Sequence, residues 1–266
     1  MLVNNLIGFM QGRLTEKGGF YPQDFPEENW RQEFYLARDF GFECIEWMFN
    51  KKQWDKNPVI MAKDLKEIMK TCKSTNIRVT GICANYFMEN SIYNPDEKVI
   101  NCSILNRLVC NAQRIGCKNI IIPLFNASEL HMDDATIYEV VNKLVENDVF
   151  ILFEANERLT NLKKWLLGFK RSNVGICYDI GNAIGLGYDS VEELSNCGDI
   201  VKNVHLKDKK IGGSTVMLGD GDGRFKECFS ALRQKSYVGS YILESYYYEA
   251  VKDTCQNLKY IKEILK

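Results

Sequence analysis

The chain has 266 residues, of which 45% are hydrophobic and 26% are charged, and its formal net charge is −1. This composition is typical of a globular protein and excludes a nucleic-acid or membrane surface that works through bulk charge. The ten cysteines include no C-x-x-C pair, so we expect reduced thiols in a cytoplasmic protein. The N-terminal residues lack a signal-peptide pattern, and no apolar run has the length of a transmembrane helix.

Eight short segments are rich in Ile, Val, Phe, Tyr or Cys and are bounded by turn or polar residues, a pattern typical of β-strands. In chain order, the predicted strands are residues 5–10, 44–49, 78–84, 119–125, 149–155, 174–180, 201–207 and 239–245.

Segments with apolar residues at helical spacing lie between the predicted strands. Clear examples are residues 26–41, 58–74, 95–116 and 134–148. The first three of these begin with proline, which suits a first helical turn, and two of them end with glycine.

Strict alternation of eight strands with helical segments indicates parallel strands joined by right-handed crossovers. Eight such units in 266 residues fit a (β/α)₈ barrel better than a doubly wound sheet, and no G-x-G-x-x-G fingerprint follows the first strand. No linker, low-complexity tract or charge block divides the chain. We therefore predict an α/β fold with a single TIM-barrel domain over residues 1–266.

Four successive predicted strands end in a residue that can bind a metal: Glu154, Asp179, His205 and Glu244. Alternate side chains of a strand share a face, so small residues accompany Asp179 and polar residues accompany His205 on one face. The carboxyl ends of barrel strands meet at one end of the barrel, where active sites of this fold lie. We expect these four side chains to point into the barrel mouth.

Three carboxylates and a neutral imidazole at one point require a cation, because the carboxylates otherwise repel each other. A set of oxygen ligands with one nitrogen favours Mn²⁺, Mg²⁺ or Co²⁺ over a structural Zn²⁺ site, which prefers thiolate and imidazole. We predict one divalent cation, Mn²⁺ in the first place, with Mg²⁺, Co²⁺ or Zn²⁺ as alternatives. The other interpretation of each residue alone is a hydrogen-bonded or solvated group at a strand end.

The strand ends belong to recognisable motifs: "YDIGN" at 178–182, "HLKD" at 205–208 and the opening "FMQGRL…FPEENW…GFECIEW". Together they resemble the xylose isomerase-like TIM barrel superfamily, in particular its sugar phosphate isomerase/epimerase group. The resemblance covers nearly the whole chain. The "QGRL" opening is similar to a subgroup with no activity that we can assign, and the four-ligand pattern is common to several activities.

The resemblance implies that Glu154, Asp179, His205 and Glu244 are the metal ligands and that the two glutamates are also the acid–base pair on opposite faces of a substrate. Two positions differ from many relatives. Asn182 stands where they have the histidine of Asp-x-x-His; it can hydrogen-bond a sugar hydroxyl but cannot take up a proton. Thr160 stands where some epimerases have a carboxylate. The predicted substrate is a sugar or sugar phosphate.

The chemistry of such a site starts from the weakly acidic hydrogen next to a carbonyl, whose removal leaves an enediolate. One glutamate takes the proton and the other returns it from the opposite face, which inverts the carbon. Return to the neighbouring carbon gives isomerisation, and loss of a β-hydroxyl makes the alternative, a sugar dehydratase. Two further alternatives are a non-catalytic sugar-binding barrel and an enzyme resembling the apurinic endonucleases; two histidines and a charge of −1 argue against the latter. We expect no nucleic-acid or membrane partner, and homo-oligomerisation stays open.

Further substrate-binding candidates are Asn182, Lys207, Arg13, Glu46 and Trp47. Lys207 could hold an anionic group of the substrate or form an ion pair with Asp208 or Glu244. Arg13 could bind an anion or be a solvated loop residue. Glu46 points into the barrel mouth or forms a buried ion pair, and Trp47 walls a sugar pocket or belongs to the core.

Two segments are open to more than one interpretation. The glycine-rich "LGDGDGR" at 218–224 could be a lid, a phosphate cradle or an ordinary turn before the next helix. His131 follows Glu129 in an acidic loop, and we expect it at the surface.

Overall fold

The computed structural model describes residues 5–15, 24–125, 135–245 and 249–265. Eight parallel strands form a closed barrel in the order β1-β10-β7-β6-β5-β4-β3-β2. The barrel strands are β1 (Ile7–Met10), β2 (Cys44–Met48), β3 (Arg78–Cys83), β4 (Asn119–Leu124), β5 (Phe150–Ala155), β6 (Val174–Asp179), β7 (Val201–Leu206) and β10 (Tyr241–Leu243).

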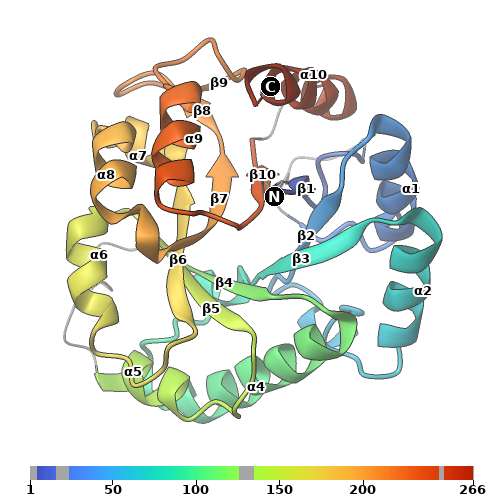
Figure 1. The fold of residues 1–266 in the computed structure, drawn as a ribbon. Helices are drawn as coiled ribbons and strands as arrows, with labels where there is room; N and C mark the ends of the chain where they lie inside the picture. Colours follow the sequence, from blue (N-terminus) through green and yellow to red (C-terminus); the bar gives the residue numbers. More distant parts are fainter. Residues whose placement is uncertain (1–4, 16–23, 126–134, 246–248, 266) are drawn as a thin grey trace.

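Helices surround the barrel and form its outer layer (Figure 1). The α-helices are α1 (Trp30–Phe40), α2 (Leu65–Thr75), α3 (Tyr86–Glu89), α4 (Lys98–Ile115), α5 (Ala135–Asn142), α6 (Leu159–Leu166), α7 (Ile180–Gly185), α8 (Ser190–Cys197), α9 (Phe225–Gln234) and α10 (Ala250–Ile264). Short 3₁₀ helices are η1 (Trp54–Lys56), η2 (Pro95–Glu97) and η3 (Gly198–Ile200). The predicted (β/α)₈ barrel is confirmed. Within the described residues, no helix has the length and apolar character needed to cross a membrane.

The predicted strands all occur, but the beginnings of two helices were wrong. After Pro26 the chain first makes a turn, in which Asn29 N–H donates to the Pro26 carbonyl, and α1 begins only at Trp30. Turns likewise separate Pro58 from α2. Proline suits the first residue of a turn as well as that of a helix, so it does not decide between the two. Pro95 does begin a helix, the 3₁₀ helix that runs into α4.

Glycine ends two of the helices as predicted. Gly41 after α1 has φ 80° and Gly116 after α4 has φ 75°, both in the left-handed region that glycine adopts without strain. In both cases the cap N–H donates to carbonyls of the last helical turn.

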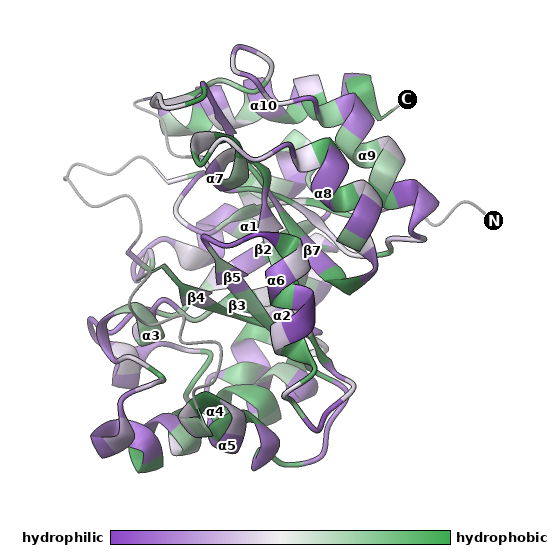
Figure 2. Ribbon diagram, turned by 90° about the vertical axis from the view of Figure 1, so that its left-hand side faces the viewer, coloured by the Kyte–Doolittle hydropathy of each residue, from purple (hydrophilic) through white to green (hydrophobic). Residues whose placement is uncertain are grey.

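Successive side chains of each strand face alternately outward, toward the helices, and inward, into the barrel. Outward-facing residues pack with the helices in one large core, and the helices carry both polar and apolar residues (Figure 2). Inside the barrel lie two small apolar clusters. One consists of Met10, Cys44, Met48, Cys83 and Ile242, and the other of Ile121, Leu152 and Cys177. The remaining interior space is therefore available to polar side chains from the same inward-facing positions.

A two-stranded antiparallel hairpin, which the sequence patterns did not predict, follows β7. Its strands are β8 (Asp208–Lys209) and β9 (Thr215–Val216), with Asp208 opposite Val216. Two-residue strands carry too little alternation to be recognised from a pattern. The hairpin begins two residues after β7 ends, so it lies next to the carboxyl end of the barrel.

Candidate metal and substrate site

Four buried side chains meet at the carboxyl end of the barrel. Glu154 belongs to β5, Asp179 ends β6, His205 belongs to β7, and Glu244 directly follows β10. Each offers one ligand atom, and these atoms all lie within 4.8 Å of one another. Asp179 and His205 are direct neighbours in the strand register. The arrangement of Glu, Asp and His residues can hold a metal ion.

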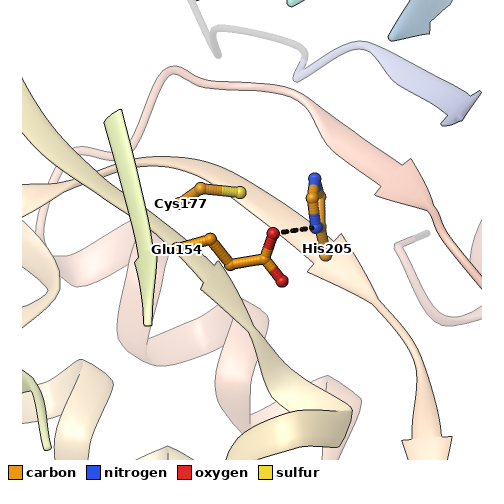
Figure 3. A group of neighbouring side chains, drawn as sticks. All are labelled: Glu154, Cys177 and His205. Carbon is orange, nitrogen blue, oxygen red and sulfur yellow. Dashed lines mark ion pairs between the residues drawn. The ribbon is translucent and has the colours of Figure 1, made fainter. Parts of the chain in front are cut away.

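The imidazole of His205 is oriented by Glu46, whose Oε1 lies 2.8 Å from Nε2. Both side chains are fully buried. Nδ1 points the other way, 3.5 Å from Glu154 Oε2 (Figure 3) and 3.9 Å from Glu244 Oε2. Among the described residues, this buried nitrogen has no hydrogen-bond partner. A histidine that donates through one nitrogen to a carboxylate and leaves the other toward further ligands has the arrangement of a metal-binding histidine.

Glu46 is itself held in place inside the barrel. Its Oε2 accepts a hydrogen bond from Asn203 Nδ2 at 2.8 Å, and Gly81 lies beside it in the strand register. A Cβ at Gly81 would come within 3.0 Å of that carboxylate, so glycine leaves the room that Glu46 occupies. Glu46 therefore lies in the barrel interior and pairs with His205. This agrees with the second of the two interpretations of Glu46, a buried ion pair.

A second group of neighbouring residues consists of Glu154, Cys177 and His205 (Figure 3). Burial raises the pKa of the Cys177 thiol to about 12, so the thiol stays protonated at neutral pH. Only a thiolate binds a metal strongly. The donor set with three carboxylates and one imidazole suits a hard divalent cation, whereas the set with Cys177 offers a softer ligand.

The three carboxyl groups differ in acidity although they lie close together. Burial raises the pKa of Asp179 to about 7, more than the attraction of Lys207 lowers it. Burial also raises the pKa of Glu154. Burial alone would raise the pKa of Glu244 as well, but Lys207, the hydrogen bond with Asp179 and the charge of His205 together outweigh it, and the pKa lies below its ordinary value. Together the carboxylates disfavour one another's charge, and a cation relieves this cost.

Lys207 supplies one positive charge to the cluster. Its Nζ lies 2.8 Å from Asp179 Oδ2 and 2.5 Å from Glu244 Oε2, and its side chain is 14% exposed. Of the two ion-pair partners that the sequence suggested, Glu244 is present and Asp208 is not. Lys207 also lines the pocket described below, so it lies between the carboxylates and the space for a ligand.

Asn182, in α7, contacts two residues of the cluster. Its backbone N–H donates to Asp179 Oδ1 at 2.8 Å, which caps α7, and its side-chain amide lies 3.5 Å from Glu154 Oε1. An amide at this place can bind a hydroxyl but cannot transfer a proton.

Two substrate-binding predictions are corrected. Trp47 points outward: its ring packs against Phe25 and Trp30, and its Nε1 donates to Asn57. Adjacent residues of a strand face opposite sides, so the inward position of Glu46 forces Trp47 into the core.

Arg13 is 1% exposed and is neither a solvated loop residue nor a free anion site. Its Nε and Nη2 donate to the backbone carbonyl of Glu244 at 2.9 and 2.7 Å. The guanidinium therefore holds the chain at the end of β10, behind one of the four cluster residues.

The glycine-rich segment 218–224 is not a phosphate cradle, because its backbone amides are already used. Gly219, Gly221 and Gly223 all donate to the carboxylate of Asp208 at 2.9–3.0 Å. A Cβ at Gly221 would lie 2.2 Å from that carboxylate, which explains the glycine. The segment fixes the β8–β9 hairpin to the barrel. His131 lies outside the described residues.

A cavity of about 250 Å³ opens beside the cluster. Its lining combines the cluster with amides and apolar side chains: Glu154, Glu244, Lys207, Asn85, Asn156, Asn182, Met10, Cys83, Met88 and Phe125. Asn85 and Asn156 were missed by sequence reasoning; each directly follows the end of a strand region, which is the only signal that could have indicated them. The cavity offers hydrogen-bonding amides and an acidic cluster to a small polar ligand.

The fold and the site define a class of protein. The family model described as xylose isomerase-like TIM barrel matches residues 34–264, and the chain belongs to this family. One curated relative is L-ribulose-5-phosphate 3-epimerase UlaE from Salmonella typhi, which is 25% identical over 244 residues, covering 85% of this chain and 86% of the relative.

Solved structures share the fold. The xylose isomerase-like TIM barrel protein from Mycobacterium smegmatis, in complex with magnesium, has a TM-score of 0.74 at 16% identity, over 98% of this chain and 96% of that chain. The 3-keto-D-glucoside 4-epimerase YcjR from E. coli has a TM-score of 0.72 at 15% identity, over 98% and 100% of the two chains.

Proposed function

We propose that this chain is a divalent-metal-dependent sugar or sugar-phosphate isomerase or epimerase that transfers a proton next to a carbonyl. The observation that carries the proposal is the meeting of Glu154, Asp179, His205 and Glu244 within 4.8 Å of one another beside a cavity of about 250 Å³. The relative named L-ribulose-5-phosphate 3-epimerase supports this class of reaction.

The cluster residues would hold the metal, with Nδ1 as the ligand atom of His205, because Nε2 is engaged by Glu46. A bound divalent cation would polarise the carbonyl and stabilise the charge of the enediolate. Mn²⁺ is the proposed ion and Mg²⁺, Co²⁺ or Zn²⁺ are alternatives, since a donor set rich in oxygen suits hard cations.

Glu154 and Glu244 are the proposed acid–base pair. They come from strands that are separated by β6 and β7 in the barrel, so they approach the cavity from different sides. One carboxylate removes the proton from the carbon beside the carbonyl and the other returns a proton to the opposite face.

Asn182 and Lys207 are proposed to orient the substrate. The Asn182 amide, 3.5 Å from Glu154, can donate to a hydroxyl near the reacting carbon. Lys207 lies between Asp179 and Glu244, reduces the repulsion between them and lines the cavity, where its ammonium group can contact a ligand.

The test is hydrogen exchange in D₂O. Metal-stripped protein is reloaded with one ion at a time, binding is verified by calorimetry, and a panel of ketoses and ketose phosphates is followed by NMR. Deuterium should enter at the carbon beside the carbonyl, should disappear with a chelator and should return with the metal. Stoichiometric metal binding without exchange on any member of the panel would contradict the proposal.

A further inference from the structure

A second lysine reaches the site from the β8–β9 hairpin. The Nζ of Lys209 lies 3.3 Å from Asn182 Oδ1, and the Nζ of Lys207 lies 3.5 Å from the same oxygen. The two ammonium groups differ in their other partners. Lys207 is neutralised by Asp179 and Glu244, whereas Lys209 forms no ion pair with any residue that the structure describes.

The backbone of Lys209 is fixed by the segment that follows the hairpin. Its backbone carbonyl accepts from Asp222 N–H at 2.9 Å, and the neighbouring Asp208 binds the three glycine amides of segment 218–224. The lysine stem then runs over α7 at Gly185, where a Cβ would lie 3.2 Å from Lys209 Cδ. One turn earlier, Gly181 makes the same room for Lys207. The face of α7 that bears Gly181 and Gly185 therefore leaves room for both lysine side chains, which extend toward Asn182.

An ammonium group that is not needed to balance a carboxylate is available to an anionic ligand. Asn182 lines the cavity, and the Nζ of Lys209 lies directly behind it, 3.3 Å from the Asn182 side-chain oxygen. A charged hydrogen bond from lysine to an anionic oxygen is stronger than one to a hydroxyl. The other basic group near the mouth, Arg13, is engaged with backbone carbonyls.

We propose that Lys209 is a specificity-determining residue that binds an anionic group, a phosphate or a carboxylate, carried by the substrate at a carbon remote from the reacting one. This inference rests on the proposed function and narrows its substrate class to anionic sugars. It also assigns a role to the glycine-rich segment, which fixes the hairpin from which Lys209 extends.

The experiment compares three substrates, a ketose 5-phosphate, a keto sugar acid and the neutral ketose of the same carbon skeleton, in the D₂O exchange assay with metal-loaded protein. The unmodified protein should show the lowest KM for one of the two anionic sugars, which also identifies the anion. Lys209→Gln should raise that KM about 10- to 100-fold and leave the KM for the neutral ketose unchanged. Lys209→Arg should restore most of the preference.

Lys210→Gln is the matched control, because Lys210 is the exposed next residue of the same hairpin. It should change neither KM, and none of the three variants should change the calorimetric metal affinity. Equal effects of Lys209→Gln on anionic and neutral substrates, or none on either, would overturn the inference while the exchange itself upholds the proposed function. If no substrate exchanges, calorimetry of the ketose phosphate with both proteins still decides: unchanged affinity in Lys209→Gln overturns the inference.

Discussion

The two ends of the barrel differ in size and in chemistry. At the amino end, the beginnings of the strands surround a cavity of about 500 Å³ lined by Arg78, Lys118, Lys202 and Lys235 among other residues. At the carboxyl end the cavity is half as large but is lined by Glu154 and Glu244, two members of the cluster that Asp179 and His205 complete. Among the described residues, no comparable group of metal ligands lies at the amino end.

The difference shows that volume alone does not indicate a site. Parallel strands all end on the same side, so residues at their carboxyl ends converge, and the loops that follow are free to add a lysine or an amide. At the amino end the lysines are spread over the rim, and one of them, Lys202, donates to the Asp199 carbonyl nearby. Four substitutions test whether the chemistry lies at the carboxyl end alone.

The largest effect is expected for Glu154→Gln at the carboxyl end. The amide keeps the shape of the side chain but cannot accept a proton, so deuterium exchange should fall about 10²- to 10⁴-fold. The measurement is the exchange rate at saturating metal, with metal content determined in parallel. An unchanged rate with bound metal would remove Glu154 from the acid–base pair.

Glu46→Gln should act through His205. Loss of the carboxylate that orients the imidazole should weaken metal affinity about 10- to 100-fold, as measured by calorimetry. Glu43→Gln is the matched control, because Glu43 precedes the same strand at the amino end, where its Oε2 accepts from Ile7 N–H. Equal metal affinities of the two variants would show that Glu46 has no part in the site.

Glu33 should give the carboxyl end a pH-dependent stability. It accepts hydrogen bonds from Gly12 and Leu14 N–H behind β1, and burial raises its pKa to about 7. The folded state therefore holds a proton that the unfolded state has released, and the free energy of unfolding should fall as the pH rises from about 4.5 to 7, by up to about 3 kcal/mol.

Glu33→Gln keeps the acceptor oxygen and removes the titration. Urea unfolding between pH 4.5 and 8 should therefore show a steeper decline for the unmodified protein than for the variant, and the difference isolates Glu33 from Asp179. Curves that stay parallel over this range would show that the pKa of Glu33 is not raised in the folded state.

The smallest effect is expected at the amino end. Lys118 is exposed on the rim of the larger cavity, so Lys118→Gln should leave the exchange rate unchanged and alter the free energy of unfolding by no more than about 0.5 kcal/mol. A loss of exchange with unchanged stability would assign a role in the reaction to the larger cavity. It would contradict the assignment of the chemistry to the carboxyl end alone.

The barrel and the members of the cluster could be predicted from the sequence. Alternating patterns placed eight strands, and parallel strands of a barrel end on one side, so residues at equivalent strand ends had to converge. The Glu154, Asp179, His205 and Glu244 positions follow from this rule alone, without knowledge of any contact across the barrel.

The pairing of the side chains could not be predicted from the sequence and became visible in the folded structure. Glu46 and His205 are 159 residues apart and meet across the barrel interior, and the choice of Lys207 between Asp208 and Glu244 depended on the hairpin after β7. Strand periodicity gives the face of a residue but not its partner, because ion pairs depend on distances between elements that are far apart in the chain. For the same reason, the sequence did not predict that Arg13 is buried and donates to the backbone carbonyl of Glu244.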